Sequence, residues 1–222
     1  MTKVPSARPR QAASLILIRP GREGPEVLTG RRGAATRFMP GRYVFPGGAV
    51  HPEDRRPWPG EIGSPVRLGG DPPHLRLARA ALRETWEETG LVLARGDGDG
   101  ATRATRRHAL SPIENALAQR RLRPDFGLLT YLGRAITPTS SPIRFHARFF
   151  LGDGRDASGE LVGNGELEDL AWRPVAALGH DLSDVTRFML THALAVWHGA
   201  TIATPLYRYV SAAVRISAAA GR

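Results

Sequence analysis

The sequence predicts an α+β fold in which helices pack against a mixed sheet. Three observations support this class. Short apolar runs bounded by Gly and Pro recur along the chain, as in strands separated by turns. Longer segments show the apolar spacing of amphipathic helices. The 222 residues suffice for one domain with a substantial core, and the 41% hydrophobic content agrees with a folded globule.

The first strands are predicted to form a hairpin. The apolar run at 13–18 is typical of a buried strand, and a second strand near 26–30 follows a Gly- and Pro-containing turn at 21–25. An Arg-rich loop, 31–42, then leads to a short apolar strand at 43–50 that is interrupted by Pro-Gly-Gly. This part of the chain therefore supplies one edge of the expected sheet.

Residues 51–73 are rich in Pro and Gly and contain few large apolar side chains, so we expect a surface excursion inserted within the domain. The segment 74–88 has strong helical spacing and is followed by Gly90, a typical helix C-cap. Further helices are predicted at 108–122, after the capping sequence around Ser111, and at 182–197. Further strands are expected at about 128–136, 144–151 and 167–173.

The chain carries 31 basic and 21 acidic residues, a net charge of +10, and Lys3 is its only lysine. Arg binds phosphate through paired hydrogen bonds, which favours an anionic ligand. A solvated, diffusely positive surface accounts for the composition equally well. The arginines are dispersed along the sequence and no helix-turn-helix or finger pattern is present, so a nucleic-acid partner is not expected.

The chain has no cysteine, which excludes disulfides, zinc–thiolate sites and cysteine nucleophiles. The apolar run near the N-terminus is short and is followed by Arg-Pro-Gly, so we interpret it as a strand and not as a signal peptide. No apolar stretch is long enough to cross a bilayer. We therefore expect a cytoplasmic protein without a membrane partner.

The most informative segment is 83–91. On a helix, Glu84, Glu87 and Glu88 are spaced i,i+3 and i,i+4, so their carboxylates share one side. Three acidic groups near a helix C-terminus repel one another and the helix dipole. A hard cation such as Mg²⁺ or Mn²⁺ would compensate, because it prefers carboxylate oxygens. Arg83 can pair with Glu87 at i,i+4.

Residues 83–91 resemble the second half of the Nudix box of the Nudix hydrolase family. The family pattern is Gly, five residues, Glu, seven residues, then Arg-Glu-aliphatic-x-Glu-Glu-x-Gly-aliphatic. Thr85 replaces the first aliphatic residue, and Gly48 matches the opening glycine. Asp54 stands where the pattern has Glu, and 28 residues, 55–82, lie before Arg83, an insertion of 21.

A long insertion is also found in a branch of the family typified by a mammalian peroxisomal coenzyme A diphosphatase. Further segments similar to that branch are 37–40, 44–48, 136–138 and 144–150. The resemblance implies the Nudix fold, an α/β/α sandwich with a mixed sheet. It divides the chain into a flexible N-terminus, 1–11, a Nudix domain, 12–200, with its insertion at 51–73, and a C-terminal extension, 201–222.

The resemblance implies metal-assisted hydrolysis of a diphosphate linked to a nucleoside. It assigns Arg83 and the three glutamates to the catalytic site, with Glu84, Glu87, Glu88 and the Gly47 carbonyl holding Mg²⁺ or Mn²⁺. Family members often use a further glutamate outside the box as ligand or base. Glu166 and Glu168 are the candidates here, with Asp169 as a competitor.

The favoured substrate is coenzyme A or an acyl-coenzyme A. We expect Phe45 and Gly48 to approach it and the loop arginines to hold an extra phosphate; these are Arg31, Arg32, Arg37 and Arg42. Four solvated arginines are an equally good interpretation. Two alternatives remain open: hydrolysis of ADP-ribose, NADH or another nucleoside diphosphate derivative, and a non-catalytic Nudix-fold module that binds nucleotide or RNA. The sequence also leaves open a homodimer.

Overall fold

The computed structural model describes residues 7–66, 72–96, 110–201, 203–210 and 213–218. Nine strands form the main sheet, in the order β10-β2-β1-β8-β7-β11-β12, with β3 beside β2 and β4 beside β1. The strands are β1 (Arg10–Gly21), β2 (Gly24–Arg32), β3 (Tyr43–Val44), β4 (Gly47–Ala49), β7 (Thr130–Ile136), β8 (Phe145–Asp153), β10 (Leu167–Pro174), β11 (Pro205–Val210) and β12 (Ala213–Ala218). The sheet is mixed, because β1 runs parallel to β8 and β7 parallel to β11, while the other pairs are antiparallel.

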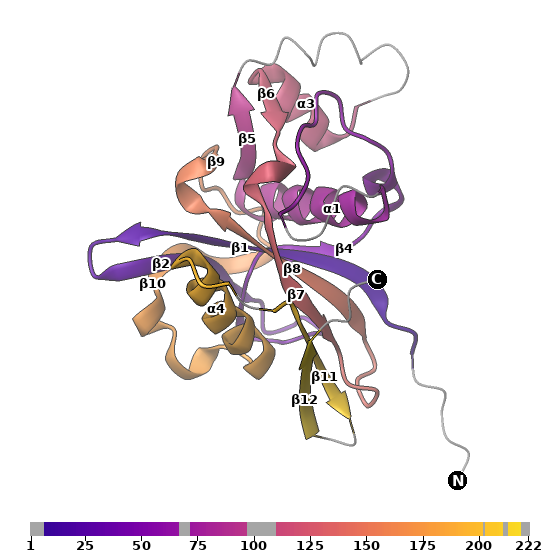
Figure 1. The fold of residues 1–222 in the computed structure, drawn as a ribbon, viewed down its shortest axis with the longest axis vertical. Coiled ribbons are helices and arrows are strands. Elements are labelled where there is room, and N and C mark those ends of the chain that lie inside the picture. The colour runs from indigo at the N-terminus through magenta and orange to yellow at the C-terminus, as the bar shows by residue number, and fades with distance from the viewer. Residues whose placement is uncertain (1–6, 67–71, 97–109, 202, 211–212, 219–222) are drawn as a thin grey trace.

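In the described part of the chain, three α-helices and a small second sheet accompany the main sheet. The helices are α1 (Pro72–Thr89), α3 (Pro112–Gln119) and α4 (Asp184–Trp197). The second sheet has the order β6-β5-β9, formed by β5 (Val92–Gly96), β6 (Leu122–Pro124) and β9 (Ala157–Ser158). Figure 1 shows this small sheet and α3 grouped beyond α1, while α4 lies on the other side of the main sheet. No helix among the described residues is long and apolar enough to span a membrane.

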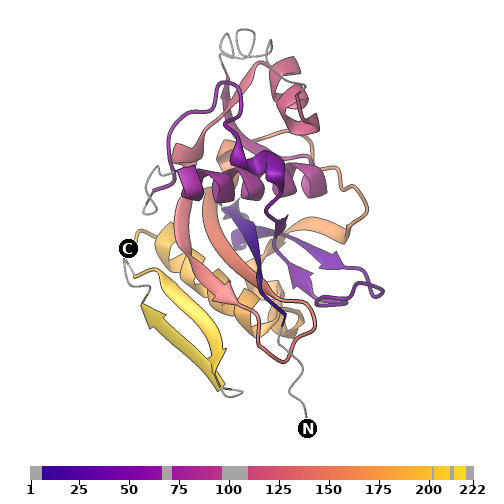
Figure 2. The same ribbon diagram turned by 90° about the vertical axis from the view of Figure 1, so that its right-hand side faces the viewer.

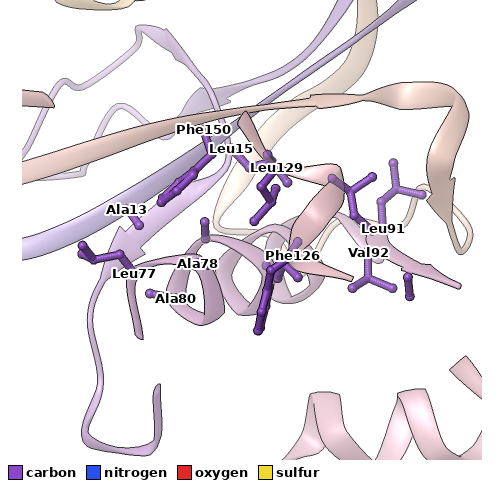
Figure 3. Close-up of a cluster of buried hydrophobic side chains, with 14 of the residues drawn as sticks. Ala13, Leu15, Leu77, Ala78, Ala80, Leu91, Val92, Phe126, Leu129 and Phe150 are labelled. Atoms are coloured by element: carbon purple, nitrogen blue, oxygen red, sulfur yellow. The ribbon is translucent and has the colours of Figure 1, made fainter. Parts of the chain in front are cut away.

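Alternation along β1 explains why both faces of the sheet are covered. Leu15 and Leu17 point into the cluster that includes the buried side of α1, whereas Ile16 and Ile18 point into the cluster on the α4 side. Figure 3 shows part of the α1 cluster, where Leu15 and Phe150 of the sheet face Ala78 of the helix. The two clusters form the core of an α/β/α sandwich, as expected from the sequence.

The predicted helices are confirmed. Residues 74–88 lie within α1, and the segment predicted at 182–197 contains α4. The helix predicted at 108–122 corresponds to the shorter α3; residues 108 and 109 lie outside the described part of the chain. Ser111 and Glu114 form the capping box that marked its start.

The insertion differs from the expected surface excursion. Trp58 is only 3% exposed and packs in the α1 cluster, and Ile62 and Val66 bridge to Asp125 and Thr130. Asp54 is fully buried. The described part of the insertion is therefore packed on the domain. Its few large side chains are enough to anchor it, because burying one Trp removes a large apolar area from water.

Both predicted boundaries also need correction. Arg10 and Gln11, expected in the flexible N-terminus, belong to β1 and pair with β8. Residues 205–218, expected in a C-terminal extension, form the β11–β12 hairpin that joins the main sheet through β7. The predicted strand 43–50 is split into β3 and β4, which pair with different partners. Figure 2 shows the hairpin beside β7 and β8.

The edge of β1 changes partner along its length. Ala12–Ser14 pair with β4, whereas Ile18–Gly21 pair with β2. The chain between β2 and β4 first pairs back onto β2 through β3 and then reaches β1 with Gly47 and Gly48, beside α1. This change of partner creates the opening in which the candidate site lies.

Candidate active site

The three glutamates of α1 differ in exposure although they share one side of the helix. Glu84 and Glu88 are buried, at 8% and 1% exposure. The side chain of Glu87 is 35% exposed. The helical spacing thus predicted that the three carboxylates share one side of α1. The contact with β4 determines which of them are shielded from solvent.

Arg83 is the centre of a buried ionic network. Its Nε and Nη2 donate to the two carboxylate oxygens of Asp54 at 2.9 and 3.0 Å. Its Nη1 donates to Glu84 and to Glu87 at 2.9 and 3.0 Å, and Nη2 also reaches the carbonyl of Ala49 at 3.0 Å. The predicted Arg83–Glu87 pair is confirmed. One guanidinium therefore holds two of the three carboxylates in place.

A second buried arginine connects the insertion to this network. Arg79 lies one turn before Arg83 on α1 and pairs with Glu61 through two bonds of 2.6 and 2.8 Å. Its Nη1 donates to the carbonyl of Asp54 at 3.1 Å. Sequence reasoning missed Glu61 and Arg79. The available signal was the i,i+4 spacing of two arginines on a largely apolar helix.

Two glycines let β4 approach the glutamates closely. The Gly47 N–H donates to Glu88 Oε2 at 2.8 Å. A Cβ on Gly48 would lie 2.4 to 2.5 Å from the carboxylate atoms of Glu84. The Leu15 N–H donates to the Pro46 carbonyl across the β1–β4 pair. Because hydrogen-bonded and non-hydrogen-bonded positions alternate along antiparallel strands, the N–H and C=O groups of Gly47 at the next position point away from β1.

The buried carboxylates carry strongly perturbed acidities. Burial raises the pKa of Glu88 to about 8; the Gly47 N–H opposes this shift, and the charges of Glu84 and Glu166 add to it. Burial also raises the pKa of Glu84, against the lowering effect of Arg83. The Asp54 and Glu84 carboxylates raise the pKa of Arg83, which stays charged despite its burial. The site thus holds more negative charge than its arginine neutralises.

The carboxylates open onto a cavity of about 700 Å³. Glu84, Glu87 and Glu166 lie on its wall. Its basic lining residues are Arg10, Arg32, Arg37 and His51. Its large apolar and aromatic lining residues are Phe38, Met39, Val44, Phe45, Ile136, Phe145, Phe149, Val185, Tyr207 and Tyr209. A cavity of this size and mixed lining suits a nucleotide-sized ligand.

The structure brings most of the predicted site residues together, but not all of them. Those that line the cavity are Gly47, Gly48, Phe45, Arg32, Arg37, Glu84, Glu87 and Glu166. Arg31 and Arg42, the other two predicted arginines, are not among its lining residues. Arg31 points to Glu168 at 3.5 Å on the far side of the strand. Glu88 lies behind Gly47 and is not part of the cavity wall.

Comparison with solved structures decides the family. A Nudix hydrolase from Alicyclobacillus acidocaldarius is 34% identical, with a TM-score of 0.60 over 87% of this chain and 85% of that one. The chain belongs to the Nudix hydrolase family. A MutT Nudix hydrolase from Burkholderia pseudomallei shares the fold at 20% identity and a TM-score of 0.50, over 84% of this chain and 98% of that one. No protein-family model and no curated protein matches the sequence.

The protein is therefore a Nudix phosphoanhydride hydrolase. Its Nudix box is divided between three elements: Gly48 on β4, Asp54 in the 3₁₀ turn Pro52–Arg55, and the charged half on α1. Asp54 replaces the usual Glu and still reaches Arg83, because the 3₁₀ turn brings its shorter side chain next to the guanidinium.

The candidates for a glutamate outside the Nudix box are separated by their surroundings. Glu166 lines the cavity and lies 3.8 Å from Arg32. Glu168 pairs with Arg31 outside the cavity. Asp169 accepts a hydrogen bond from Tyr43 and pairs with Arg173 at 2.7 Å. Of the three, Glu166 alone lies on the cavity wall.

The donor set of this Nudix site fits a hard divalent cation, because it consists of carboxylate oxygens with excess negative charge. In the described part of the chain, however, no three acidic or His side chains already converge on one point. Glu84 and Glu87 turn toward Arg83 instead. Glu87 is the most exposed of the three glutamates, at 35% of its side chain.

Proposed function

We propose that this Nudix enzyme is a Mg²⁺- or Mn²⁺-dependent diphosphatase that cleaves a nucleoside diphosphate derivative, with coenzyme A or an acyl-coenzyme A as its favoured substrate. The observation that carries the proposal is that Glu84 and Glu87 of α1 lie on the wall of the 700 Å³ cavity. At this wall, a diphosphate would meet the carboxylates while the rest of the ligand occupies the cavity.

The metal ligands in this proposal are Glu84, Glu87, Glu88 and the carbonyl of Gly47. A bound Mg²⁺ or Mn²⁺ would neutralise phosphate oxygens and lower the pKa of a water. Arg83 holds Glu84 and Glu87 on the cavity side of α1. The buried position of Glu88 and the orientation of the Gly47 backbone away from β1 support their inclusion.

Glu166 is the proposed general base. Its carboxylate lines the same cavity as Glu84 and Glu87, and it is close enough to Glu88 to raise the pKa of that residue. A base must reach the attacking water from the substrate side, which a residue behind the wall cannot do. Arg32, at 3.8 Å, can orient the Glu166 carboxylate.

Coenzyme A is favoured because the cavity offers both kinds of surface that this molecule requires. Arg10, Arg32 and Arg37 line it and can bind phosphate groups, including one outside the diphosphate. Aromatic and aliphatic side chains line the remainder, among them Phe145 and Phe149. A substrate with several phosphates and a long neutral arm matches this division.

Product analysis tests the proposal. The purified protein is incubated with Mg²⁺ and with coenzyme A, acetyl-coenzyme A, ADP-ribose or NADH, next to Glu88→Gln and a control, Glu23→Gln, at an exposed turn. Release of 3′,5′-ADP and 4′-phosphopantetheine from coenzyme A, lost in Glu88→Gln alone, is the expected result. AMP from ADP-ribose or NADH, with coenzyme A left intact, would overturn the substrate and favour the first alternative.

A nucleotide-binding module without hydrolysis is the second alternative. It would form no product from any of the four compounds and would bind nucleotide equally well in EDTA. Equilibrium binding with and without EDTA therefore distinguishes it from the enzyme. The retained set of Arg83 and three glutamates favours the enzyme, because nucleotide binding alone does not require three crowded carboxylates.

A further inference from the structure

The sheet face that α1 covers continues beyond the helix as a row of basic side chains. Arg148 on β8 lies directly opposite Arg134 on β7, and Arg208 on β11 lies directly opposite Arg215 on β12. Paired residues share one face of a sheet. Tyr131 and Phe150, which pair on that same face, belong to the α1 cluster.

Neighbouring residues complete the row. Arg208 pairs with Ile136, which in turn pairs with His146 on β8. Arg76, near the start of α1, lies close enough to act on the charge of Arg148. We call Arg76, Arg134, His146, Arg148, Arg208 and Arg215 the basic row. In Figure 2, β7, β8 and the β11–β12 hairpin extend past α1.

The basic row has no acidic partner in the described part of the chain. None of its members forms an ion pair there, and Arg148 Nη1 donates only to the Gln11 side chain at 2.5 Å and to the His146 carbonyl at 3.1 Å. Arg76 Nε, Arg134 Nε and His146 Nε2 are shielded from solvent without a hydrogen-bond partner. Like charges paired across strands destabilise a sheet, so this arrangement requires a compensating charge.

The pKa shifts of Arg148 and His146 agree with the close spacing of positive charges in the basic row. Burial lowers the pKa of Arg148, and the charges of Arg134 and Arg76 contribute to that shift. Burial, followed by the charges of Arg148 and Arg134, lowers the pKa of His146 to about 4, so this imidazole is neutral at pH 7. The local potential is thus strongly positive, which favours a bound anion.

We propose that Arg76, Arg134 and Arg148 form a second anion site for a phosphate group, and that Arg208 and Arg215 extend it to the next phosphates of a linear oligophosphate. The two arginine pairs are neighbours on this face, because Arg134 and Arg208 stand on the adjacent parallel strands β7 and β11, two residues apart in register. No member of the row lines the catalytic cavity. The site is therefore separate from the hydrolytic one, and it does not depend on the proposed substrate.

The chemistry of the row favours an oligophosphate over a single-stranded nucleic acid. Binding of single strands usually combines basic residues with aromatic side chains on which bases stack. The aromatic residues beside the row on this face, Tyr131 and Phe150, are both buried, so neither offers a surface on which a base could stack. Phosphate recognition by the guanidinium groups is therefore the simpler use of this surface.

Calorimetry with the full chain in EDTA, at constant ionic strength in chloride, tests the proposal. We expect tripolyphosphate to bind at least tenfold more tightly than inorganic phosphate. Arg134→Gln or Arg148→Gln should weaken the binding of both anions at least tenfold. Each should also raise the melting temperature in chloride without added phosphate, because it removes one of two repelling charges. The double variant Arg208→Gln/Arg215→Gln should retain phosphate binding and lose the advantage of tripolyphosphate.

Arg22→Gln, at the exposed turn between β1 and β2, serves as the charge-matched control and should bind both anions like the wild type. Arg37→Gln reports any anion binding in the catalytic cavity. Three outcomes would overturn the proposal: no binding of either anion above chloride, loss of binding in Arg37→Gln with none in Arg134→Gln, or Arg134-dependent binding of oligodeoxythymidine without binding of tripolyphosphate. The last would identify a nucleic-acid surface. Because these measurements use no turnover, they are independent of whether coenzyme A is the substrate.

Discussion

Asp54 and Arg83 form a fully buried, two-bonded ion pair, with N–O distances of 2.9 and 3.0 Å and no more than 1% of either side chain exposed. The pair joins the insertion to the helix that carries the glutamates. The same guanidinium holds Glu84 and Glu87, so its orientation sets the position of both carboxylates. A structural contact in the insertion is thereby coupled to the chemistry of the site.

Asp54→Ala should destabilise the protein by about 3–5 kcal/mol, because it leaves the Arg83 charge buried without its main partner. Chemical denaturation measures this loss. Asp54→Glu restores a carboxylate and should recover most of the stability and activity. Glu53→Gln is the matched control, since Glu53 is 39% exposed and 3.8 Å from Arg83. Equal losses for Glu53→Gln and Asp54→Ala would contradict the role of the buried pair.

Gly48→Ala should lower kcat at least tenfold while leaving a folded protein. The added Cβ would lie 2.4 to 2.5 Å from the carboxylate atoms of Glu84, which must move away from the site. Steady-state kinetics and circular dichroism separate the two effects. Gly96→Ala, where a Cβ meets nothing within 4 Å, is the control and should behave like the wild type. Full activity in Gly48→Ala would show that catalysis does not depend on the present position of the Glu84 carboxylate.

Glu88 should make the stability of the metal-free protein depend on pH. Its pKa is about 8 in the folded protein and ordinarily 4.5, so between these values the folded state keeps a proton that the unfolded chain releases. Stability therefore falls as the pH rises from about 4.5 to about 8. The glutamine side chain of Glu88→Gln is uncharged at every pH, so the variant does not undergo this part of the loss of stability.

Urea denaturation in EDTA at pH 5, 6.5 and 8 provides the measurement. Glu88→Gln should match the wild type at pH 5 and exceed it at pH 8 by at least about 1 kcal/mol, since one pKa unit corresponds to about 1.4 kcal/mol. Added Mg²⁺ should stabilise the wild type at pH 8 and the variant much less. A pH-independent difference between the two proteins would rule out titration of Glu88 as the cause.

Arg37 and Arg31 should differ in their effect on substrate binding. Arg37 lines the cavity, whereas Arg31 pairs with Glu168 outside it. Arg37→Ala is expected to raise KM about tenfold for a substrate that carries an additional phosphate, with little change in kcat, because a bound phosphate loses a charged hydrogen-bond partner. Arg31→Ala should leave both constants within about twofold of the wild type. The reverse pattern would place the phosphate outside this cavity.

Local sequence determined the parts of this protein that depend on neighbouring residues along the chain. Helical spacing placed Glu84, Glu87 and Glu88 on one side of α1 and predicted the Arg83–Glu87 pair, because 3.6 residues per turn is a property of the backbone alone. Apolar runs located the strands that enter the core. The charged half of the Nudix box indicated the family because all of its residues lie within one helix and its C-terminal end.

The tertiary structure decided everything that depends on which strands pair and in what register. Pairing of β4 with β1 buries Glu88 and makes Gly48 indispensable, and the folding of the insertion onto α1 joins Glu61 to Arg79. The arginines looked dispersed in the sequence, yet strand order gathers several of them into the basic row. Such contacts join residues far apart in the chain, and the free energy that selects them comes from packing the whole sheet against both helical layers.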